Sequence, residues 1–500
     1  MEFLSKGGYA EVFYDKQKRD VYRRLPRRNN ETKQVDTASF CDLIFTRSME
    51  HTGVTPVIYD EEISKDYVSY RMPYYGVSLH HWVRQVTLET RRKYAPFIML
   101  QIVLACIHFE KNAFFHSDIK PLNIMIETIE SREDNRSTDD DEDDYKKTLC
   151  VHVIDFNCSS VKTIDHKNQT REWTYGIGTW HYMPPEIILH EMPCANSASW
   201  MIGILAAYII DEYPLRDLVK NKKDIELLEQ NVWKELIQQW CMEKQEHVSF
   251  PRSRHYSDTW NELIYHCTHW RSIDRWSLTR IYHFLYEKLL DHNSPDRINI
   301  RPPYSIPDIL NTQHRIHTTR LPEEQRHHVI ETMYAICENM DKMMVFPTGV
   351  AIFDRVCYVM SEEEIQGKVA QLAAGSFLLS CFMNNVSILP SRTYMTRMLN
   401  SFACINRVHA LAALCYIGQT LLWKLWEKPS HIYVVEWEET YYWDRSLFEH
   451  IKTVLLNVER TYTQYWVAEK VLKRMGTPPA PPLPSPRKDV MNSHAIDCDR

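Results

Sequence analysis

The segment that decides the fold is His116-Ser117-Asp118-Ile119-Lys120-Pro121-Leu122-Asn123. It follows an apolar run, residues 95–109, that has the length of a buried helix. A second apolar run, residues 149–154, is typical of a buried strand and leads directly into Asp155. The pattern predicts a loop between a buried helix and a strand that runs into Asp155.

This segment resembles the catalytic loop of eukaryotic protein kinases. Moving a γ-phosphoryl group needs metal ions on the phosphates and an acceptor held in line. The resemblance implies that Asp118 receives or orients the proton of the substrate hydroxyl, and that Asn123 and Asp155 hold Mg²⁺. Lys120 is the residue type that Ser/Thr-specific members carry to steady the transferred phosphate. A Ser/Thr acceptor is therefore favoured.

Other motifs of the family lie on either side, in the expected order. Ser5-Lys6-Gly7-Gly8-Tyr9-Ala10-Glu11-Val12 resembles the glycine-rich loop over the ATP phosphates, which makes Gly7, Gly8 and Val12 candidate nucleotide-binding residues. Gly178-Thr179-Trp180-His181-Tyr182-Met183-Pro184-Pro185-Glu186 resembles the end of the activation segment, and Arg275 stands where the family places the partner of that glutamate. The resemblance covers about residues 1–290. It implies an α+β bilobal fold, with a small β-rich N-lobe and a helical C-lobe.

The residues that should anchor ATP depart from the family pattern. Only arginine is available on the third strand, where a lysine is usual, and alternation favours Arg23, with Val21 on the same face as a floor for adenine. Asp42 stands where the partner glutamate of the next helix is expected. A longer cation facing a shorter acid can keep a similar span, which predicts a compensated pair. The alternative is that Arg23 is a surface residue in a lobe that binds ATP poorly.

Three further substitutions fall near the expected chemistry. Ser117 replaces the arginine that reads a phosphate on the activation loop, so ordering by phosphorylation is not expected. Asn157 replaces a glycine and is a residue type that tolerates glycine-like backbone angles. Ala198 takes the place of a buried aspartate that braces the catalytic loop, a change that would lower the rate without removing the site.

A second domain is predicted after a linker at 291–320, where proline breaks the helical periodicity. Apolar residues at helical spacing predict an all-α domain over 321–475, with helices at 322–344, 348–360, 365–382, 391–402 and 407–426.

Within this domain, Phe353-Asp354-Arg355 and the run 369–380 resemble a cyclin box, in which small residues such as Gly375 let two helices approach closely. The alternative is an unrelated helical bundle. Phe382 and Asn385 replace the lysine and glutamate with which cyclins contact their kinase, so any such contact must use other groups.

Joining a kinase to a cyclin-like module suggests regulation within one chain. We expect the helical domain to be an intramolecular partner that docks on the helix bearing Asp42 and holds Arg23 and Asp42 in place. This arrangement would suit the loss of the phosphate-reading arginine at Ser117.

Two segments are expected to be disordered. Residues 128–147 form an acidic insertion, since 130–147 hold nine acids and four bases, a net charge of about -5. The insertion is either a solvated loop or a docking site for a basic partner. The tail, 476–500, contains a proline-rich run at 478–484 that resembles an SH3-type ligand, the alternative being a plain terminal tail.

Composition indicates a folded intracellular protein, cytoplasmic or nuclear. The hydrophobic content of 44% supports two or three domains, and the odd count of 13 cysteines indicates reduced core residues. Apolar runs such as 201–210 are too short to cross a bilayer, so no membrane is expected, and no basic patch indicates nucleic-acid binding. Divergence of this degree is compatible with a viral protein in a host cell.

These observations predict an ATP- and Mg²⁺-dependent serine/threonine-protein kinase that phosphorylates protein substrates and is regulated by its cyclin-like domain. The alternative is a pseudokinase scaffold with weak or no phosphotransfer. A small-molecule phosphotransferase would share the aspartates but would not need the 178–186 segment.

Overall fold

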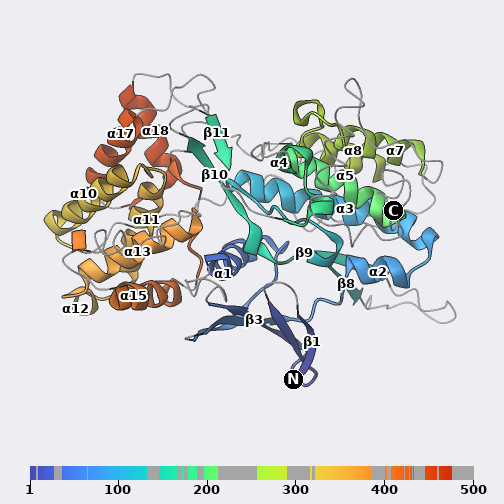
Figure 1. Ribbon diagram of the computed structural model, residues 1–500, viewed down its shortest axis with the longest axis horizontal. Coiled ribbons are helices and arrows are strands. Elements are labelled where there is room, and N and C mark those ends of the chain that lie inside the picture. The colour runs from blue at the N-terminus through green and yellow to red at the C-terminus, as the bar shows by residue number, and fades with distance from the viewer. Residues whose placement is uncertain are drawn as a thin grey trace, which may run out of the picture.

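The chain folds into a β-rich lobe, a mainly helical lobe and a C-terminal group of helices (Figure 1). A computed structural model describes residues 1–6, 10–27, 37–64, 66–131, 146–165, 170–173, 178–188, 196–211, 256–289, 316–317, 321–384, 400–402, 407–421, 423–426, 428–430, 432, 445–458 and 461–475. The two expected halves of the bilobal kinase fold are both present, and the third part follows them in the sequence.

The N-terminal lobe is a five-stranded antiparallel sheet with one long helix. The strands run in the order β1-β2-β3-β5-β4, and their bounds are β1 Glu2–Lys6, β2 Glu11–Asp15, β3 Asp20–Pro26, β4 Tyr59–Ile63 and β5 Tyr67–Pro73. The helix is α1, Thr37–Met49, followed by the short 3₁₀ turn η1, Glu50–Thr52. The register pairs Arg23 with Val12 on one side and with Tyr70 on the other. These three side chains therefore share a face of the sheet.

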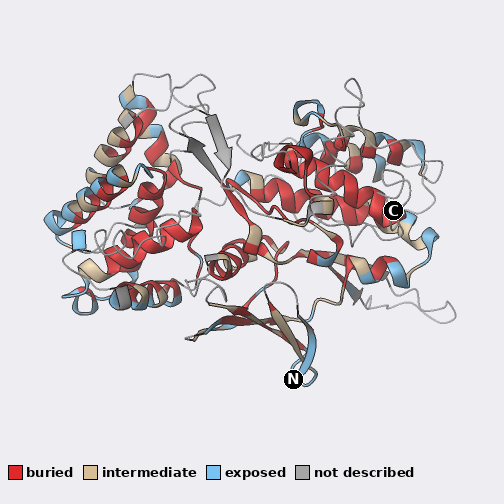
Figure 2. Cartoon of the chain, in the orientation of Figure 1, coloured by how far each residue is buried: buried red, intermediate tan, exposed pale blue. Residues whose placement is uncertain are grey.

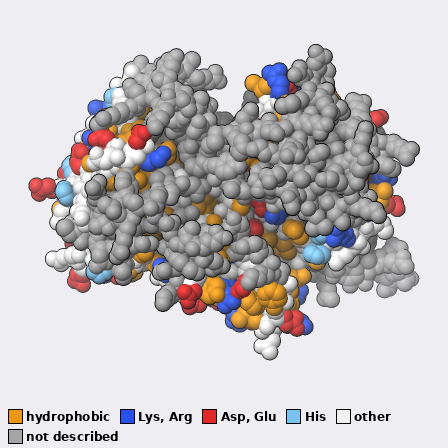
Figure 3. All heavy atoms as spheres, in the orientation of Figure 1, with side chains coloured by type: hydrophobic (Ala, Val, Ile, Leu, Met, Phe, Trp, Pro, Cys, Tyr) orange, Lys and Arg blue, Asp and Glu red, His pale blue; other side chains and the backbone are white. Residues whose placement is uncertain are grey.

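The opposite face of this sheet carries Arg24. Its guanidinium lies over the rings of Tyr67 and Phe13, at 4.3 and 5.4 Å from their centroids, where cation–π attraction holds it. Hydrophobic side chains gather over the N-terminal sheet, with basic and acidic side chains among them (Figure 3). Of the two arginines, Arg23 is the buried one and Arg24 lies on the outer face.

The second lobe is built around buried helices. Its elements are β6 Val77–Ser78, α2 Leu79–Gln85, α3 Leu88–Lys111, β7 Phe114–Phe115, η2 Pro121–Asn123, β8 Ile124–Ser131, β9 Lys146–Val153, η3 Phe156–Cys158, β10 Ser160–Asp165, β11 Thr170–Trp173, η4 Trp180–Tyr182, α4 Pro185–Ile188, α5 Ser197–Ile210, α7 Asp258–Cys267, η6 Ser272–Asp274 and α8 Leu278–Leu289. The helix and strand expected around the catalytic loop are present as α3 and β9. Figure 2 shows α3 and α5 buried along most of their length.

A buried ion pair ties this lobe together as predicted. Arg275 meets both carboxylate oxygens of Glu186 at 2.7 Å, and the hydroxyl of Ser197 donates to the same carboxylate at 2.6 Å. All these donors and acceptors are buried. The pair joins α4, which ends the activation segment, to the loop after α7.

One expectation about apolar segments was wrong. Among the described helices, α3 is long and apolar enough to cross a bilayer, whereas the longest runs were expected to be too short. In the structure 78% of the apolar 18-residue stretch of this helix is buried inside the protein. Such burial is typical of the core helix of a soluble domain, and α3 packs against α5 and α8 here.

Where the structure describes it, the C-terminal part is helical apart from one small strand pair. Its described elements are β12 Ile316–His317, α10 Glu323–Met340, α11 Val345–Val359, α12 Glu362–Ile365, α13 Val369–Met383, α15 Arg407–Thr420, α17 Arg445–Leu456, β13 Thr461–Tyr462 and α18 Gln464–Met475. A Cβ added to Gly375 would lie 2.9 Å from the backbone nitrogen of Leu414, so α13 and α15 approach as closely as the small residues predicted.

The structure moves several expected boundaries. Strands β8 and β9 pair as far as Ser131 and Lys146, so both ends of the predicted 128–147 insertion belong to a hairpin. The expected linker includes β12, which pairs with β13 and so joins the helical part. The helix expected to reach Trp426 ends at Thr420, and Trp423 has a left-handed φ of 58° that a continuing helix would not allow. The rest of the acidic insertion, most of the linker and the 476–500 tail lie outside the described residues.

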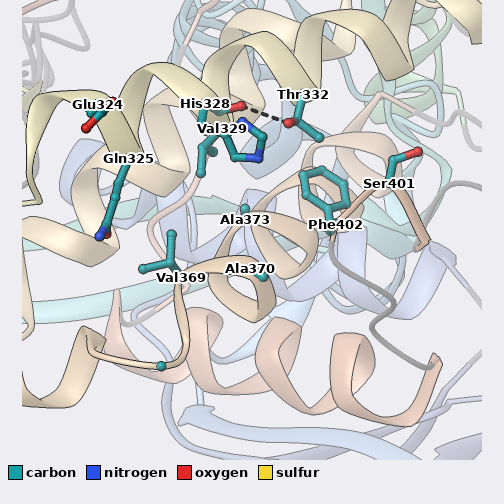
Figure 4. A pocket seen from close by; sticks show the side chains of 11 residues that line it. Glu324, Gln325, His328, Val329, Thr332, Val369, Ala370, Ala373, Ser401 and Phe402 are labelled. Carbon is teal, nitrogen blue, oxygen red and sulfur yellow. Dashed lines mark hydrogen bonds between the residues drawn. The ribbon is translucent and has the colours of Figure 1, made fainter.

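A cavity of about 510 Å³ lies between α10 and α13 in the helical part (Figure 4). Val329, Ala370 and Phe402 give it an apolar lining, and Thr332 uses its hydroxyl to bond the carbonyl of His328 at 2.8 Å. Neither the catalytic loop nor Asp155 lines this cavity. It is separate from the candidate active site.

Candidate active site

The polar side chains of the 116–123 loop converge on the carboxylate of Asp118. Its Oδ2 accepts hydrogen bonds from Lys120 Nζ at 2.7 Å and from Asn123 Nδ2 at 2.9 Å. Its Oδ1 accepts the backbone N–H of Thr179 at 2.8 Å, and Lys120 Nζ also donates to the Thr179 hydroxyl at 2.7 Å. The three residues expected to be catalytic therefore lie together, and Thr179 from the activation segment closes the cluster.

The protonation of this loop follows from its contacts. Burial raises the pKa of Asp118, but Lys120 and the hydrogen bonds outweigh burial and leave that pKa below its ordinary value. Asp118 is therefore ionised at neutral pH. Burial lowers the pKa of His116, so its imidazole is neutral. His116 Nε2 lies 3.1 Å from the carbonyl oxygen of Ile154, which can only accept, so Nε2 carries the proton.

Asp155 follows β9 in a left-handed backbone conformation. Its φ and ψ are 74° and 68°, in a region that aspartate and asparagine tolerate better than most residues. The next residue, Phe156, is buried, with its ring centroid 4.7 Å from that of His116. Glycine-like angles were expected to matter at Asn157, but that residue has no positive φ. The special backbone position is Asp155 itself.

Arg23 joins the N-terminal lobe to Asp155. Its Nη2 donates to Asp155 Oδ1 at 2.5 Å, and its Nε lies 3.2 Å from Asp42 Oδ2. Burial lowers the pKa of Arg23, but Asp155 and Asp42 raise it by more, so the guanidinium stays charged. The expected pairing of Arg23 with Asp42 is present, and the alternative of a surface arginine is wrong, because only 5% of the side chain is exposed.

The other candidate nucleotide contacts are partly described. Val21 is buried on the face of β3 that carries Arg23, and Val12 is half-buried directly across from Arg23 on β2. Both aliphatic side chains therefore share the face of the sheet that carries Arg23. Gly7 and Gly8 lie outside the described residues.

Ser117 binds the activation segment through a neutral contact. Its hydroxyl lies 2.8 Å from that of Ser160 on β10. A Cβ added to Gly178 would lie 2.0 Å from the Ser117 carbonyl oxygen, so only glycine fits at 178. The catalytic loop is thus packed against both ends of the activation segment without a charged residue at 117.

Ala198 leaves a small apolar gap beneath the loop. It lines a cavity of about 20 Å³ together with His116 and Ile119. This volume is enough for one water molecule at most. The brace expected from an aspartate at this position is replaced by packing.

The oxygen atoms present fit a magnesium ion shared with a nucleotide. Mg²⁺ is usually held by one or two carboxylates together with substrate phosphates. Asp155 is 23% exposed at its side chain, and Asn123 donates through Nδ2, which leaves its Oδ1 as a ligand atom. Among the described residues no group of three or more His, Cys, Asp or Glu side chains could hold a metal alone. A cation here would therefore depend on the phosphates.

Comparison with known proteins agrees with this geometry. A family model described as the protein kinase domain matches residues 2–287, more than half of the chain. The chain belongs to the protein kinase family, whose members use ATP and a divalent cation.

Curated relatives match shorter stretches. Over 129 residues the chain is 30% identical to a cGMP-dependent protein kinase of Toxoplasma gondii, a match that covers 26% of this chain and 10% of the relative. Over 221 residues it is 21% identical to calcium-dependent protein kinase 4 of Plasmodium berghei, covering 43% of this chain and 37% of that protein. The chain thus spans well under half the length of these relatives.

Sequence reasoning missed two residues of the site. Thr179 was recognised as part of a motif but not as a ligand of Asp118 and Lys120. Tyr70 donates its hydroxyl to Asp42 at 2.7 Å and was not singled out at all. The register of β3 with β5 would have revealed Tyr70, because it lies directly opposite Arg23.

Proposed function

We propose that this chain is a serine/threonine protein kinase that transfers the γ-phosphoryl group of ATP, with Mg²⁺, to protein substrates. The observation that carries the proposal is the Asp118 cluster, in which a lysine and an activation-segment threonine flank an ionised carboxylate. In this account Asp118 orients the acceptor hydroxyl and takes its proton. Lys120 stabilises the charge on the transferred phosphate.

Asn123 and Asp155 would hold the cation, and Arg23 would meet the nucleotide phosphates from the sheet. The cation, when bound, neutralises charge on the β- and γ-phosphates. Asp42 keeps Arg23 oriented, and Val12 and Val21 give the adenine an apolar surface. Gly7 and Gly8 belong to the loop that covers the phosphates in this proposal.

Acceptor specificity is tested with three peptides that differ only in carrying Ser, Thr or Tyr as the sole acceptor. Label transfer to the Ser and Thr peptides and none to Tyr is the expected result. Equal transfer to the Tyr peptide would contradict the role given to Lys120.

We further propose that the C-terminal helices form a cyclin-like domain that activates the kinase in cis. Support comes from their contacts with α1, the helix that carries Asp42. The ring of Phe382 on α13 lies 5.8 Å from that of Phe40, and the Cys41 thiol meets the Phe382 carbonyl at 3.5 Å. The ring of Trp423 also lies close to Phe40, with the two centroids 6.1 Å apart. Phe382 thus makes an apolar contact where a lysine was expected from cyclins, while Asn385 lies outside the described residues.

Trp426 extends this interface from α1 to the end of α3, which precedes the catalytic loop. Its backbone N–H donates to the hydroxyl of Ser48 at 3.0 Å, and its Nε1 donates to the carbonyl of Asn112 at 2.8 Å. Its ring lies 5.2 Å from Phe45, which in turn lies 4.9 Å from Phe114. A covalently joined domain has an effective concentration of up to about millimolar. The helical domain can therefore hold α1 inward without a phosphorylated loop.

Replacing Phe382 by aspartate should lower phosphotransfer about 5- to 150-fold, the range of a typical coupling between sites. The new carboxylate would be buried against Phe40 and would separate α13 from α1. Initial rates with saturating peptide and ATP measure the effect.

The matched control is Val359→Asp, because Val359 lies on α11 of the same domain with 60% of its surface exposed. It should leave the rate unchanged. A Phe382→Asp protein that unfolds at the wild-type temperature and keeps the wild-type rate would contradict activation in cis.

A pseudokinase scaffold is the second candidate. The contact between Arg23 and Asp155 favours it, because a cation must compete with the guanidinium for Asp155 Oδ1. The apolar gap at Ala198 favours it as well. Wild-type label transfer no greater than that of Asp118→Ala and Asp155→Ala variants would support the scaffold.

A further inference from the structure

The buried carboxylate of Asp42 has two aligned hydrogen-bond donors, and one of them is a tyrosine hydroxyl. Tyr70 donates to Oδ2 at 2.7 Å, and the backbone N–H of Phe156 donates to Oδ1 at 2.7 Å. Arg23 Nε lies 3.2 Å from Oδ2 but is not aligned for a hydrogen bond. We propose that Tyr70 is a positioning residue of the phosphotransfer site, which orients Asp42 and thereby Arg23 and Asp155.

The shape of the site explains why a tyrosine is needed. Aspartate is shorter than glutamate by one methylene, about 1.5 Å of reach. Tyr70 lies across from Arg23 on β5, on the same face of the sheet, so its long side chain points to the space between β3 and α1. Its hydroxyl meets the carboxylate where a longer acid would otherwise extend. Tyr70 and Asp42 therefore fill this space together.

The Tyr70 hydroxyl is protonated at neutral pH and can donate to Asp42. Burial raises the pKa of Tyr70 well above its ordinary value, and the charge of Asp42 raises it further. Burial raises the pKa of Asp42 above its ordinary value, although Arg23 opposes this shift. The direction of the carboxylate is set by its two aligned hydrogen bonds, from the Tyr70 hydroxyl and the Phe156 N–H. Arg23 contributes its positive charge.

Asp42 is connected to Asp155, the proposed metal ligand, in two ways. Asp42 holds the backbone of Phe156, the residue after Asp155, and it attracts Arg23, which binds the Asp155 side chain at 2.5 Å. Without the Tyr70 hydroxyl, the Asp42 carboxylate can rotate about its side-chain bonds, which weakens its contacts with both Phe156 and Arg23. The expected consequence is a misplaced Asp155 in an otherwise folded lobe.

The inference rests on the proposed kinase function and is tested by a cycle of full-length variants: Tyr70→Phe, Asp42→Glu and the double variant. Tyr70→Phe should lower kcat about 10-fold, with the KM for the acceptor peptide unchanged. Asp42→Glu should lower kcat by more than Tyr70→Phe does, because the longer acid meets the tyrosine hydroxyl in a filled site. The double variant should recover to within about 3-fold of wild type, since the deleted hydroxyl makes room for the added methylene.

The matched control is Tyr67→Phe, on the same strand with its ring beneath Arg24 on the outer face. It should behave as wild type. The affinity of the four proteins for ATP with Mg²⁺, measured by calorimetry, gives a second reading of the same cycle.

The measurements of kcat and of ATP affinity distinguish a failure of the proposed kinase function from a failure of the role given to Tyr70. Absence of label transfer in wild type would refute the kinase function, while rescue of ATP affinity in the double variant would still support the role of Tyr70. A Tyr70→Phe protein with wild-type kcat and affinity would overturn the inference. So would a double variant no better than Asp42→Glu in both readings.

Discussion

Replacing Asp118 by asparagine should lower kcat about 10²- to 10⁴-fold, the usual contribution of a general base. The amide is nearly the same shape as the carboxylate, and its one oxygen can still accept the backbone N–H of Thr179, but its amino group cannot accept from Asn123. What is lost is the negative charge that accepts the substrate proton and pairs with Lys120. Steady-state rates with labelled ATP and a Ser peptide measure the effect.

The Asp155→Ala variant separates this loss from a loss of nucleotide binding. It removes the carboxylate proposed to hold the cation and leaves Arg23 with Asp42 as its remaining partner. We expect weaker ATP affinity in magnesium for Asp155→Ala and near-normal affinity for Asp118→Asn. Equal residual rates for wild type and Asp118→Asn would show that Asp118 is not the base.

Replacing Asp354 by alanine should lower the free energy of unfolding of the helical domain by about 3–5 kcal/mol, because one member of a buried ion pair is lost. Asp354 is fully buried and accepts hydrogen bonds from Arg326 Nε at 2.9 Å, Arg326 Nη2 at 2.8 Å and the Tyr462 hydroxyl at 2.9 Å. The variant leaves a guanidinium buried with the Leu455 carbonyl as its remaining acceptor among these contacts. Urea unfolding followed by circular dichroism measures the loss.

The paired variant Arg326→Met with Asp354→Leu is the control for this stability prediction. Apolar residues of similar volume often replace a buried ion pair at little cost. We expect the paired variant to regain most of the stability lost in Asp354→Ala. If Asp354→Ala unfolds at the wild-type urea concentration, the pair does not organise this domain.

The catalytic loop was predictable because its chemistry is local in sequence. Asp118, Lys120 and Asn123 lie within one short segment, and Asp155 follows a strand with a clear apolar pattern. Alternation along β3 was enough to choose Arg23 over Arg24, since inward and outward side chains differ by one residue. Such residues can be identified without knowledge of the tertiary structure.

Other features depend on contacts between distant segments. Tyr70 became significant only once β5 was placed beside β3, and Trp426 only once its chain turned back to Ser48. The end of α15 at Thr420 was missed because apolar residues continue beyond it, while the left-handed backbone at Trp423 has no sequence signal. The hairpin β8–β9 was shortened in the prediction because its charged ends resemble a solvated loop.

The central claim is that the chain transfers phosphate although Arg23 and Asp42 replace the usual lysine and glutamate. The most direct test is incubation of the full-length protein with γ-labelled ATP, magnesium and a Ser/Thr protein substrate, beside the Asp118→Asn and Asp155→Ala proteins as background. The account predicts label in the substrate that grows with time and exceeds that background. Label equal to the background, from wild-type protein that is folded and binds ATP, would contradict it.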